Sequence, residues 1–129
     1  MQSENHKKTI YAAILGAGTV GTGVYKLCQE MKSEFVQKTG ADLVVKKVLV
    51  RNASKKREGI EDAVLTDNWK EIIEDPEIDI VIEVMGGIEP AKTYIIEALE
   101  AGKQIVTANK DLLAKTLCRK DITLLTAAT

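Results

Sequence analysis

The sequence predicts an α/β protein in which a parallel sheet carries helices on both faces, a doubly wound fold. Apolar runs of strand length alternate along the chain with segments of helical periodicity. A glycine-rich turn separates the first such run from the first helical pattern. The 129 residues, 45% of them hydrophobic, supply one core. We therefore expect a single domain, because a second full domain does not fit in this length.

The glycine turn follows the apolar run 10–15 and has the spacing Gly16, Gly18, Gly21. In dinucleotide-binding proteins the first glycine permits the turn, the second lets the backbone approach the pyrophosphate, and the third lets the helix pack closely. A helix beginning near Thr19 directs its N–H groups and positive dipole at the anion. A plain structural turn is the alternative, but the order strand, turn, helix favours a nucleotide site and a Rossmann-like fold.

The first helix is expected from about Thr19 to about Thr39, with Gly40 as a left-handed stop. Its apolar face is predicted from residues that recur at helical spacing, namely Val20, Val24, Leu27, Met31 and Phe35. Cys28 is expected in the core. Because neither Cys28 nor Cys118 belongs to a CxxC pair, we expect free thiols and no metal site.

The second strand is predicted at residues 43–50. Lys46 and Lys47 interrupt its apolar run, so we expect this strand near a sheet edge, or starting further along. A charged loop, residues 51–58, follows it.

A short helix is expected through Ile73, with Asp67 or Asn68 as its cap. It ends at residues 75–76, because the proline there disfavours helical conformation in the residue before it. The nearly continuous apolar run 78–85 predicts a central strand covered on both faces.

A second long helix follows, with Pro90 at its first position and Gly102 at its end. One face of this helix is marked by Ala91, Tyr94, Ile95, Ala98 and Leu99. The next strand, residues 104–108, is expected beside the first strand across the point where the strand order reverses. Asn109 then caps a further short helix.

The end of the second strand indicates which cofactor is bound. Enzymes that prefer NAD usually place an acid there for the ribose hydroxyls, yet this chain has Arg51 and Asn52. Four cations follow closely: Arg51, Lys55, Lys56 and Arg57. Because Arg51 can grip a phosphate through two hydrogen bonds and Lys56 adds charge, NADP is the expected cofactor and NAD stays possible. A solvated basic loop is the alternative.

Glu83 interrupts the third predicted strand, so its carboxylate must be paired, hydrated or near the strand end. A hydrogen bond to a ribose or a loop N–H competes there with a purely structural partner. Gly86 and Gly87 follow at the sheet edge where ligands bind, and either a tight turn or a cofactor explains them.

Lys110 is a candidate functional residue, because a cation at a helix start opposes the dipole unless an anion compensates it. A cofactor, a substrate carboxylate or Asp111 would compensate. The alternative is a side chain that reaches solvent.

Composition argues against several other classes of function. A net charge of −1 and 4% aromatic residues do not suit a nucleic-acid or membrane-surface binder. Residues 1–8 form a polar leader without a secretory core, and no apolar run reaches membrane-spanning length. His6 is expected to belong to a frayed terminus. We therefore expect a cytoplasmic protein whose partners are small molecules.

Four segments of the chain resemble, in order, the N-terminal nucleotide-binding part of homoserine dehydrogenase. They are ILGAGTVGTGVYKLC, VLVRNASKKR, DIVIEVMGGIEPA and IVTANKDLLAK, which span most of the chain from Tyr11 to Lys115. The resemblance implies an NAD(P)-binding domain over residues 9–115. It also implies interconversion of L-homoserine and L-aspartate 4-semialdehyde with NADP(H) or NAD(H), a step toward threonine, methionine and isoleucine.

The resemblance also implies roles for individual residues. Contacts to the pyrophosphate fall on Gly16, Gly18, Thr19, Val20 and Gly21. Arg51 would bind the 2′-phosphate, Gly86 and Gly87 would line the cofactor cleft, and Lys110 would lie beside nicotinamide and substrate as the catalytic lysine.

Residues 116–129 depart from the family pattern. In the family the chain continues into a substrate-binding and dimerising domain with an acid, a second lysine and a monovalent cation site. We expect a truncated or altered reading frame here, although residues 122–126 can supply one more strand. The full-length family is expected to be homodimeric, and this chain is expected to bind cofactor with little turnover.

Two other functions stay open at this stage. One is a noncatalytic NADP(H)-sensing or regulatory module. The other is the cofactor domain of a different semialdehyde or imine reductase, which should lack the segment ANKDLLAK.

Overall fold

A computed structural model describes residues 8–87, 89–107 and 125–126. Six strands, all paired in parallel, form one sheet in the order β3-β2-β1-β4-β5-β6. The strands are β1 (Lys8–Leu15), β2 (Ala41–Leu49), β3 (Leu65–Thr66), β4 (Ile78–Glu83), β5 (Gln104–Thr107) and β6 (Leu125–Thr126). The helices are α1 (Thr19–Glu30), α2 (Lys32–Thr39), α3 (Lys70–Ile73) and α4 (Ala91–Glu100), with a 3₁₀ turn η2 at Asp62–Val64.

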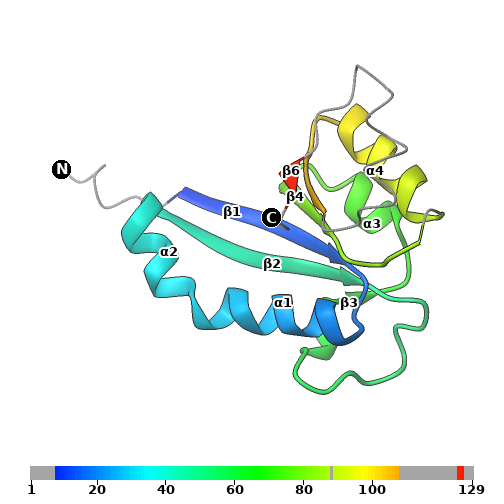
Figure 1. The fold of residues 1–129 in the computed structure, drawn as a ribbon, viewed down its shortest axis with the longest axis horizontal. Coiled ribbons are helices and arrows are strands. Elements are labelled where there is room, and N and C mark those ends of the chain that lie inside the picture. The colour runs from blue at the N-terminus through cyan, green and yellow to red at the C-terminus, as the bar shows by residue number, and fades with distance from the viewer. Residues whose placement is uncertain (1–7, 88, 108–124, 127–129) are drawn as a thin grey trace.

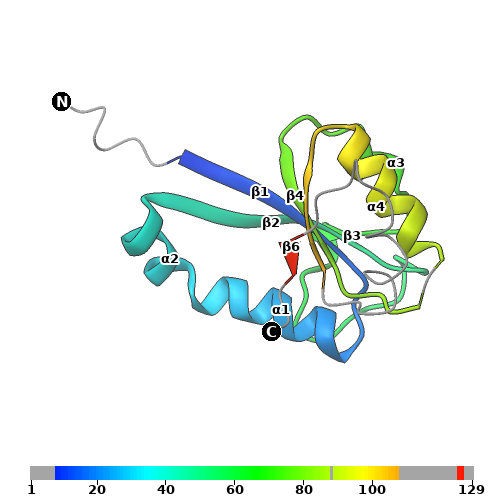
Figure 2. The same ribbon diagram turned by 45° about the horizontal axis from the view of Figure 1, so that its top comes forward.

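Helices cover both faces of the sheet, which confirms the predicted doubly wound α/β fold (Figure 1). One buried cluster packs α3 and α4 on the sheet: Ala13, Leu15, Leu49, Ile72, Ile78, Val81, Ala91, Ile95, Ala98 and Ile105. The other packs α1 on the opposite face: Ile14, Ala17, Tyr25, Val45, Val48, Val50, Ile60 and Leu65. Successive residues of β1 alternate between the clusters because side chains of a strand point to opposite faces. Figure 2 shows the two helical layers from a second direction.

The predicted neighbour of the first strand is wrong. β4 pairs with β1, with Leu15 opposite Glu83, and β5 pairs only with β4 and β6. The strand order changes direction between β1 and β4, and the sequence predicts β5 at that point, beside β1. β5 instead lies one strand further away, on the far side of β4. The more apolar β4 takes the place where both faces are covered, and the α4 crossover then adds β5 beyond it.

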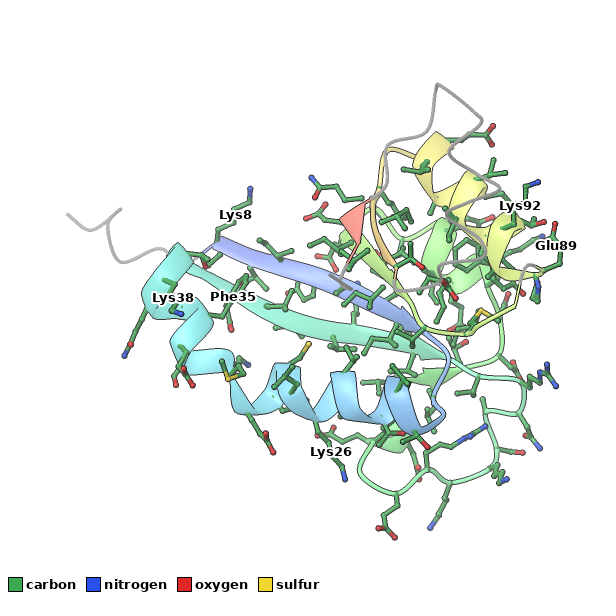
Figure 3. The ribbon with its side chains drawn as sticks, viewed as in Figure 1. Lys8, Lys26, Phe35, Lys38, Glu89 and Lys92 are labelled. Carbon is green, nitrogen blue, oxygen red and sulfur yellow. The ribbon has the colours of Figure 1, made fainter. Side chains whose placement is uncertain are left out.

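The predicted first helix is divided in two, and its packing face differs from the expected one. Met31 lies between α1 and α2, whereas Gly40 ends α2 with a φ of 74°, as predicted. Three residues of the predicted apolar face are exposed: Val20, Leu27 and Met31. The cause is that α1 packs on the sheet through Gly21 and Tyr25. The side of the helix that carries Val20 and Leu27 therefore faces solvent. Phe35, labelled in Figure 3, is half-buried.

β2 lies close to a sheet edge, as its lysines predicted. β3 pairs only with Val48 and Leu49, so most of β2 has β1 as its single neighbour. The strand begins two residues earlier than expected, at Ala41. The Lys46 ammonium lies 2.7 Å from an Asp75 carboxylate oxygen and 2.6 Å from one of Glu77.

The remaining helix boundaries largely match the predictions. Asn68, and not Asp67, accepts a hydrogen bond from the Lys70 N–H at 3.1 Å ahead of α3. Pro90 precedes α4 by one residue, and the Glu89 carboxylate at this helix start accepts hydrogen bonds from Thr93 (Figure 3). The predicted extra strand in 122–126 is present as β6.

Two further observations concern the whole described chain. No helix in the described part is both long enough and apolar enough to cross a membrane. Cys28 is half-buried beside the α1 cluster, and burial raises the pKa of its thiol. His6, Asn109, Lys110 and Cys118 lie outside the described residues.

Candidate cofactor-binding cleft

A cleft of about 440 Å³ opens at the carboxyl ends of the strands, where the strand order reverses. In open α/β sheets ligands bind at this place. The lining comes from the glycine turn, the end of β2, the loops after β3 and β4, and α4. The lining residues are Gly16, Ala17, Gly18, Leu49, Val50, Arg51, Arg57, Asp67, Val84, Met85, Pro90 and Tyr94.

The three glycines of the turn differ in what surrounds them. Gly16 has a φ of 107°, which disfavours any side chain, and a Cβ there would lie 3.4 Å from Met85. A Cβ on Gly21 would lie 2.1 Å from the carbonyl oxygen of Gly16, so the helix start packs directly on the turn. Gly18 meets no atom within 4 Å, so its position beside the cleft is open. The second glycine thus leaves space where a ligand would approach.

The amino end of α1 is suited to an anion. Its first backbone hydrogen bond runs from the Thr22 N–H to the Gly18 carbonyl at 2.9 Å, and no side chain caps the helix. The N–H groups of Thr19, Val20 and Gly21 therefore precede the helix's own hydrogen bonds. Thr19 and Val20 are exposed in this first turn. Such N–H groups and the helix dipole favour a phosphate.

Two arginines form the basic side of the cleft. Arg51 follows β2, as predicted, and Arg57 joins it, whereas Lys56 is exposed and does not line the cleft. Asn52 folds the intervening loop by accepting hydrogen bonds from the Ser54 N–H at 3.1 Å and its hydroxyl at 2.6 Å. Neither arginine forms an ion pair with a carboxylate in the described part of the chain, and the Arg57 Nε is buried there without a partner.

The sequence did not predict the rest of the lining. Asp67 follows β3, and Tyr94 comes from α4. Tyr94 stacks on Trp69 with ring centroids 4.4 Å apart, and Trp69 donates a hydrogen bond to Glu97 at 2.7 Å. Of these additional lining residues, only Arg57 could have been found from the sequence, because it belongs to the basic run after the second strand. Asp67 and Tyr94 reach the cleft only because the sheet brings their elements together.

Glu83 ends β4 and is fully buried. Its carboxylate accepts hydrogen bonds from the Thr107 hydroxyl at 2.5 Å, the Met85 N–H at 2.8 Å and the Gly86 N–H at 3.3 Å. Of the predicted alternatives, the strand-end position with a loop N–H partner is the one observed. Gly86 and Gly87 are exposed with φ values of 80° and 73°, and neither lines the cleft.

The described part of the cleft therefore combines an open glycine turn, a helix amino end and two arginines. This combination is chemically suited to phosphate groups at two points, one at the helix and one after β2. The predicted Lys110 lies outside the described residues. Within the described chain, no group of three histidine, cysteine or acidic side chains is arranged to hold a metal ion.

Comparison with known proteins identifies relatives of this arrangement. The family profile described as the NAD binding domain of homoserine dehydrogenase matches residues 16–128. Homoserine dehydrogenase from Bacillus subtilis is 45% identical over 108 residues, which is 83% of this chain and 25% of that protein. The Lactococcus lactis enzyme is 49% identical over 111 residues, 82% of this chain and 26% of its own length. The chain thus spans about a quarter of the length of these curated relatives.

Solved structures give the same result. The S. aureus homoserine dehydrogenase at pH 6.5 superposes with a TM-score of 0.85 and 40% identity, over 95% of this chain and 33% of that one. The enzyme from Thiobacillus denitrificans gives 0.79 and 39%, over 85% of this chain and 26% of that one. Fold, cleft and sequence agree, and the chain belongs to the homoserine dehydrogenase NAD-binding domain family.

Proposed function

We propose that this chain is the NADP(H)-binding domain of a homoserine dehydrogenase, the oxidoreductase that interconverts L-homoserine and L-aspartate 4-semialdehyde. Membership of the family supports a nicotinamide cofactor. The observation that carries the choice of NADP is the pair Arg51 and Arg57 in the cleft after β2, where an NAD enzyme would present an acid.

The proposed contacts follow the two phosphate-binding points. The pyrophosphate lies against the glycine turn and the first turn of α1: Gly16, Gly18, Thr19, Val20 and Gly21. Arg51 and Arg57 bind the 2′-phosphate, and the exposed Lys56 adds charge at the rim. Gly86 and Gly87, which follow the cleft residue Met85, are proposed to let the backbone approach a part of the cofactor beyond the described cleft lining. Lys110 is the proposed catalytic lysine beside the nicotinamide.

The chain's own contribution to the reaction is to hold the cofactor. The cofactor supplies the hydride, and transfer also requires a substrate held against the nicotinamide and an acid for the developing alkoxide. Because the chain spans about a quarter of its relatives, we propose that this polypeptide binds cofactor with little turnover. Substrate binding and homodimerisation are proposed for a protein with the full length of these relatives.

Titration of NADPH and NADH tests the choice of cofactor. Trp69, the single tryptophan, stacks on the cleft residue Tyr94, so its emission should fall when a reduced nicotinamide binds. We expect NADPH to bind at least about tenfold more tightly than NADH. R51A should weaken NADPH by roughly ten- to a hundredfold, the scale of hydrogen bonds to charged groups, and change NADH by less than about threefold.

The matched control is K55A, which removes an exposed cation from the same loop without touching the cleft lining. It should leave both affinities close to those of the wild type. Equal affinity of the wild type for NADPH and NADH would contradict the assignment of the 2′-phosphate to Arg51. Absence of binding to either would contradict the proposed function.

A further inference from the structure

We propose that Glu83 and Thr107 are a positioning pair that sets the geometry of the cleft on the nicotinamide side. This inference rests on the proposed function, because it concerns how that cofactor is held.

The Glu83 carboxylate is fully buried and is satisfied by neutral donors in the described chain. One oxygen accepts from the Thr107 hydroxyl and the other accepts from two backbone N–H groups. Burying a carboxylate is costly, and an apolar side chain of similar size would fill the same space without that cost. Packing alone therefore does not account for a carboxylate here, whereas a need to fix its neighbours does.

The first element that Glu83 fixes is the loop after β4. Its hydrogen bonds hold the Met85 and Gly86 N–H groups. Met85 lines the cleft and lies directly against Gly16 of the glycine turn. The position of this loop therefore sets one wall of the cleft.

The second element is the end of β5. Thr107 pairs with Glu83 in the sheet and donates its hydroxyl to the same carboxylate. Thr107 is also the last residue of β5, three positions before Lys110 in the sequence. One side chain thus fixes both the loop after β4 and the exit of the chain from β5.

Both elements lie on one side of the point where the strand order reverses. β4 and β5 are on that side, while Arg51 and Arg57 follow β2 on the other. A dinucleotide bound across the reversal with its 2′-phosphate at the arginines extends its nicotinamide over β4 and β5. A loss of the Glu83–Thr107 bond should therefore affect the nicotinamide half and spare the adenosine half.

Two ligands separate these halves in a binding experiment. NADPH occupies the whole cleft, and 2′,5′-ADP carries only the adenosine half with its 2′-phosphate. T107V removes the hydroxyl and keeps the shape, and T107S, the matched control, keeps the hydroxyl. We expect T107V to weaken NADPH about five- to tenfold and 2′,5′-ADP by less than about twofold, with T107S near the wild type. The emission of bound NADPH at saturation should also fall in T107V, because a loosely held nicotinamide is less protected.

E83Q provides a second measurement should T107V fold poorly in a thermal melt. Its amide oxygen can accept from the loop N–H groups and its amide nitrogen can donate to the Thr107 oxygen, so both connections persist. NADPH affinity should stay within about threefold of the wild type. A loss in E83Q as large as that expected for T107V would overturn the positioning role, since geometry would then not be what matters.

The outcomes separate this inference from the proposed function. Equal weakening of NADPH and 2′,5′-ADP in T107V would indicate a general effect on the fold and overturn the inference. Unchanged NADPH binding in T107V would do the same while leaving the proposed function intact. A wild type that binds neither ligand would instead contradict the proposed function itself.

Discussion

At the scale of single residues, the glycine turn assigns one physical task to each glycine. Gly16 takes a conformation that side chains avoid, Gly21 leaves no room for a Cβ against the Gly16 carbonyl, and Gly18 borders open space. A substitution at each position should therefore impair the protein for a different physical reason. Two of these differences give sharp predictions.

G18A should leave the fold intact and damage cofactor binding. The φ of Gly18 is −72°, which any residue adopts, and its Cβ would meet no protein atom within 4 Å. A methyl group there would occupy space that the pyrophosphate needs. We expect an unchanged melting temperature and roughly a tenfold or greater loss of NADPH affinity, measured by Trp69 quenching. Unchanged affinity would place the pyrophosphate elsewhere.

G21A should destabilise the fold itself. Its Cβ would approach the Gly16 carbonyl oxygen to 2.1 Å, and backbone must move to relieve this contact. We expect a loss of about 1–3 kcal/mol in the free energy of unfolding, measured with urea.

The control for G21A is G23A on the same helix, where a Cβ meets no atom within 4 Å. Removing a glycine from the helix interior should raise stability there by about 0.5–1 kcal/mol. Equal effects of the two substitutions would show that α1 does not pack on the turn through Gly21.

The basic loop shows how far single residues were predictable. Arg51 follows a strand directly, so the strand prediction also placed the residue at the sheet edge. Lys56 was predicted in the site, yet Arg57 is the residue that lines the cleft. The side chains of adjacent loop residues point in different directions. Their directions here depend on the turn that Asn52 forms through its hydrogen bonds with Ser54, and the composition of the loop does not reveal that turn.

At the scale of elements, two lysines join the loop between α3 and β4 to its neighbours. Lys46 of β2 pairs with Asp75 and Glu77. The buried Lys103, just before β5, donates to the carbonyls of Asp75 and Ile78 at 2.7 Å each. This loop is therefore held by β2 on one side and by the residue that precedes β5 on the other, and these two strands do not pair with each other.

The Lys46 pair should make stability depend on pH. Its hydrogen bond with Asp75 lowers the pKa of that carboxyl, and hydrogen bonds to Asp75 and Glu77 raise the pKa of Lys46. A lowered carboxyl pKa contributes stability above the ordinary aspartate pKa, and this is lost as pH falls through the lowered value. K46M should cost about 0.5–1 kcal/mol near pH 7, the scale of a partly exposed pair, and less near pH 3.

Urea unfolding at several pH values measures this difference. The matched control is K47M on the same strand, whose lysine lies 3.4 Å from Glu71 and not near Asp75. Its effect should not depend on Asp75 protonation. A K46M deficit that grows as the pH falls would contradict the assigned sign.

Strand neighbours are the element-scale feature that the sequence did not supply. Periodicity located β1, β2, β4 and β5, but the expected pairing of β5 with β1 was wrong. The hydrophobic pattern of a strand indicates how many of its faces are covered, but it does not indicate which strand lies beside it. The packing face of α1 was only partly predicted: Val24 packs on the core, but Val20, Leu27 and Met31 are exposed because the helix buries Gly21 and Tyr25.

At the scale of the whole molecule, the strand order brings together the parts that we propose bind phosphate. Residues separated by up to 78 positions, from Gly16 to Tyr94, line one cleft because parallel strands end at the same edge. Holding a cofactor is not catalysis, since only interactions that strengthen in the transition state raise the rate.

The polypeptide should therefore bind NADPH without efficient turnover. Homoserine oxidation followed by NADPH absorbance should run far below the roughly 1–1000 s⁻¹ of ordinary enzymes. Turnover in that range would contradict the proposal that this chain lacks what the reaction needs. Saturable NADPH binding in the same preparation is the control for a folded sample.

The sequence by itself determined strands β1, β2, β4 and β5, helix α4, the glycine turn and the arginine after β2, because hydrophobic period and glycine spacing are local properties of the chain. Only the tertiary structure decided that β4 lies beside β1, that Arg57 and Tyr94 join the cleft, and that Glu83 binds Thr107. Those contacts join residues far apart in the chain, and their geometry exists only once the strands have paired and the helices have packed on them.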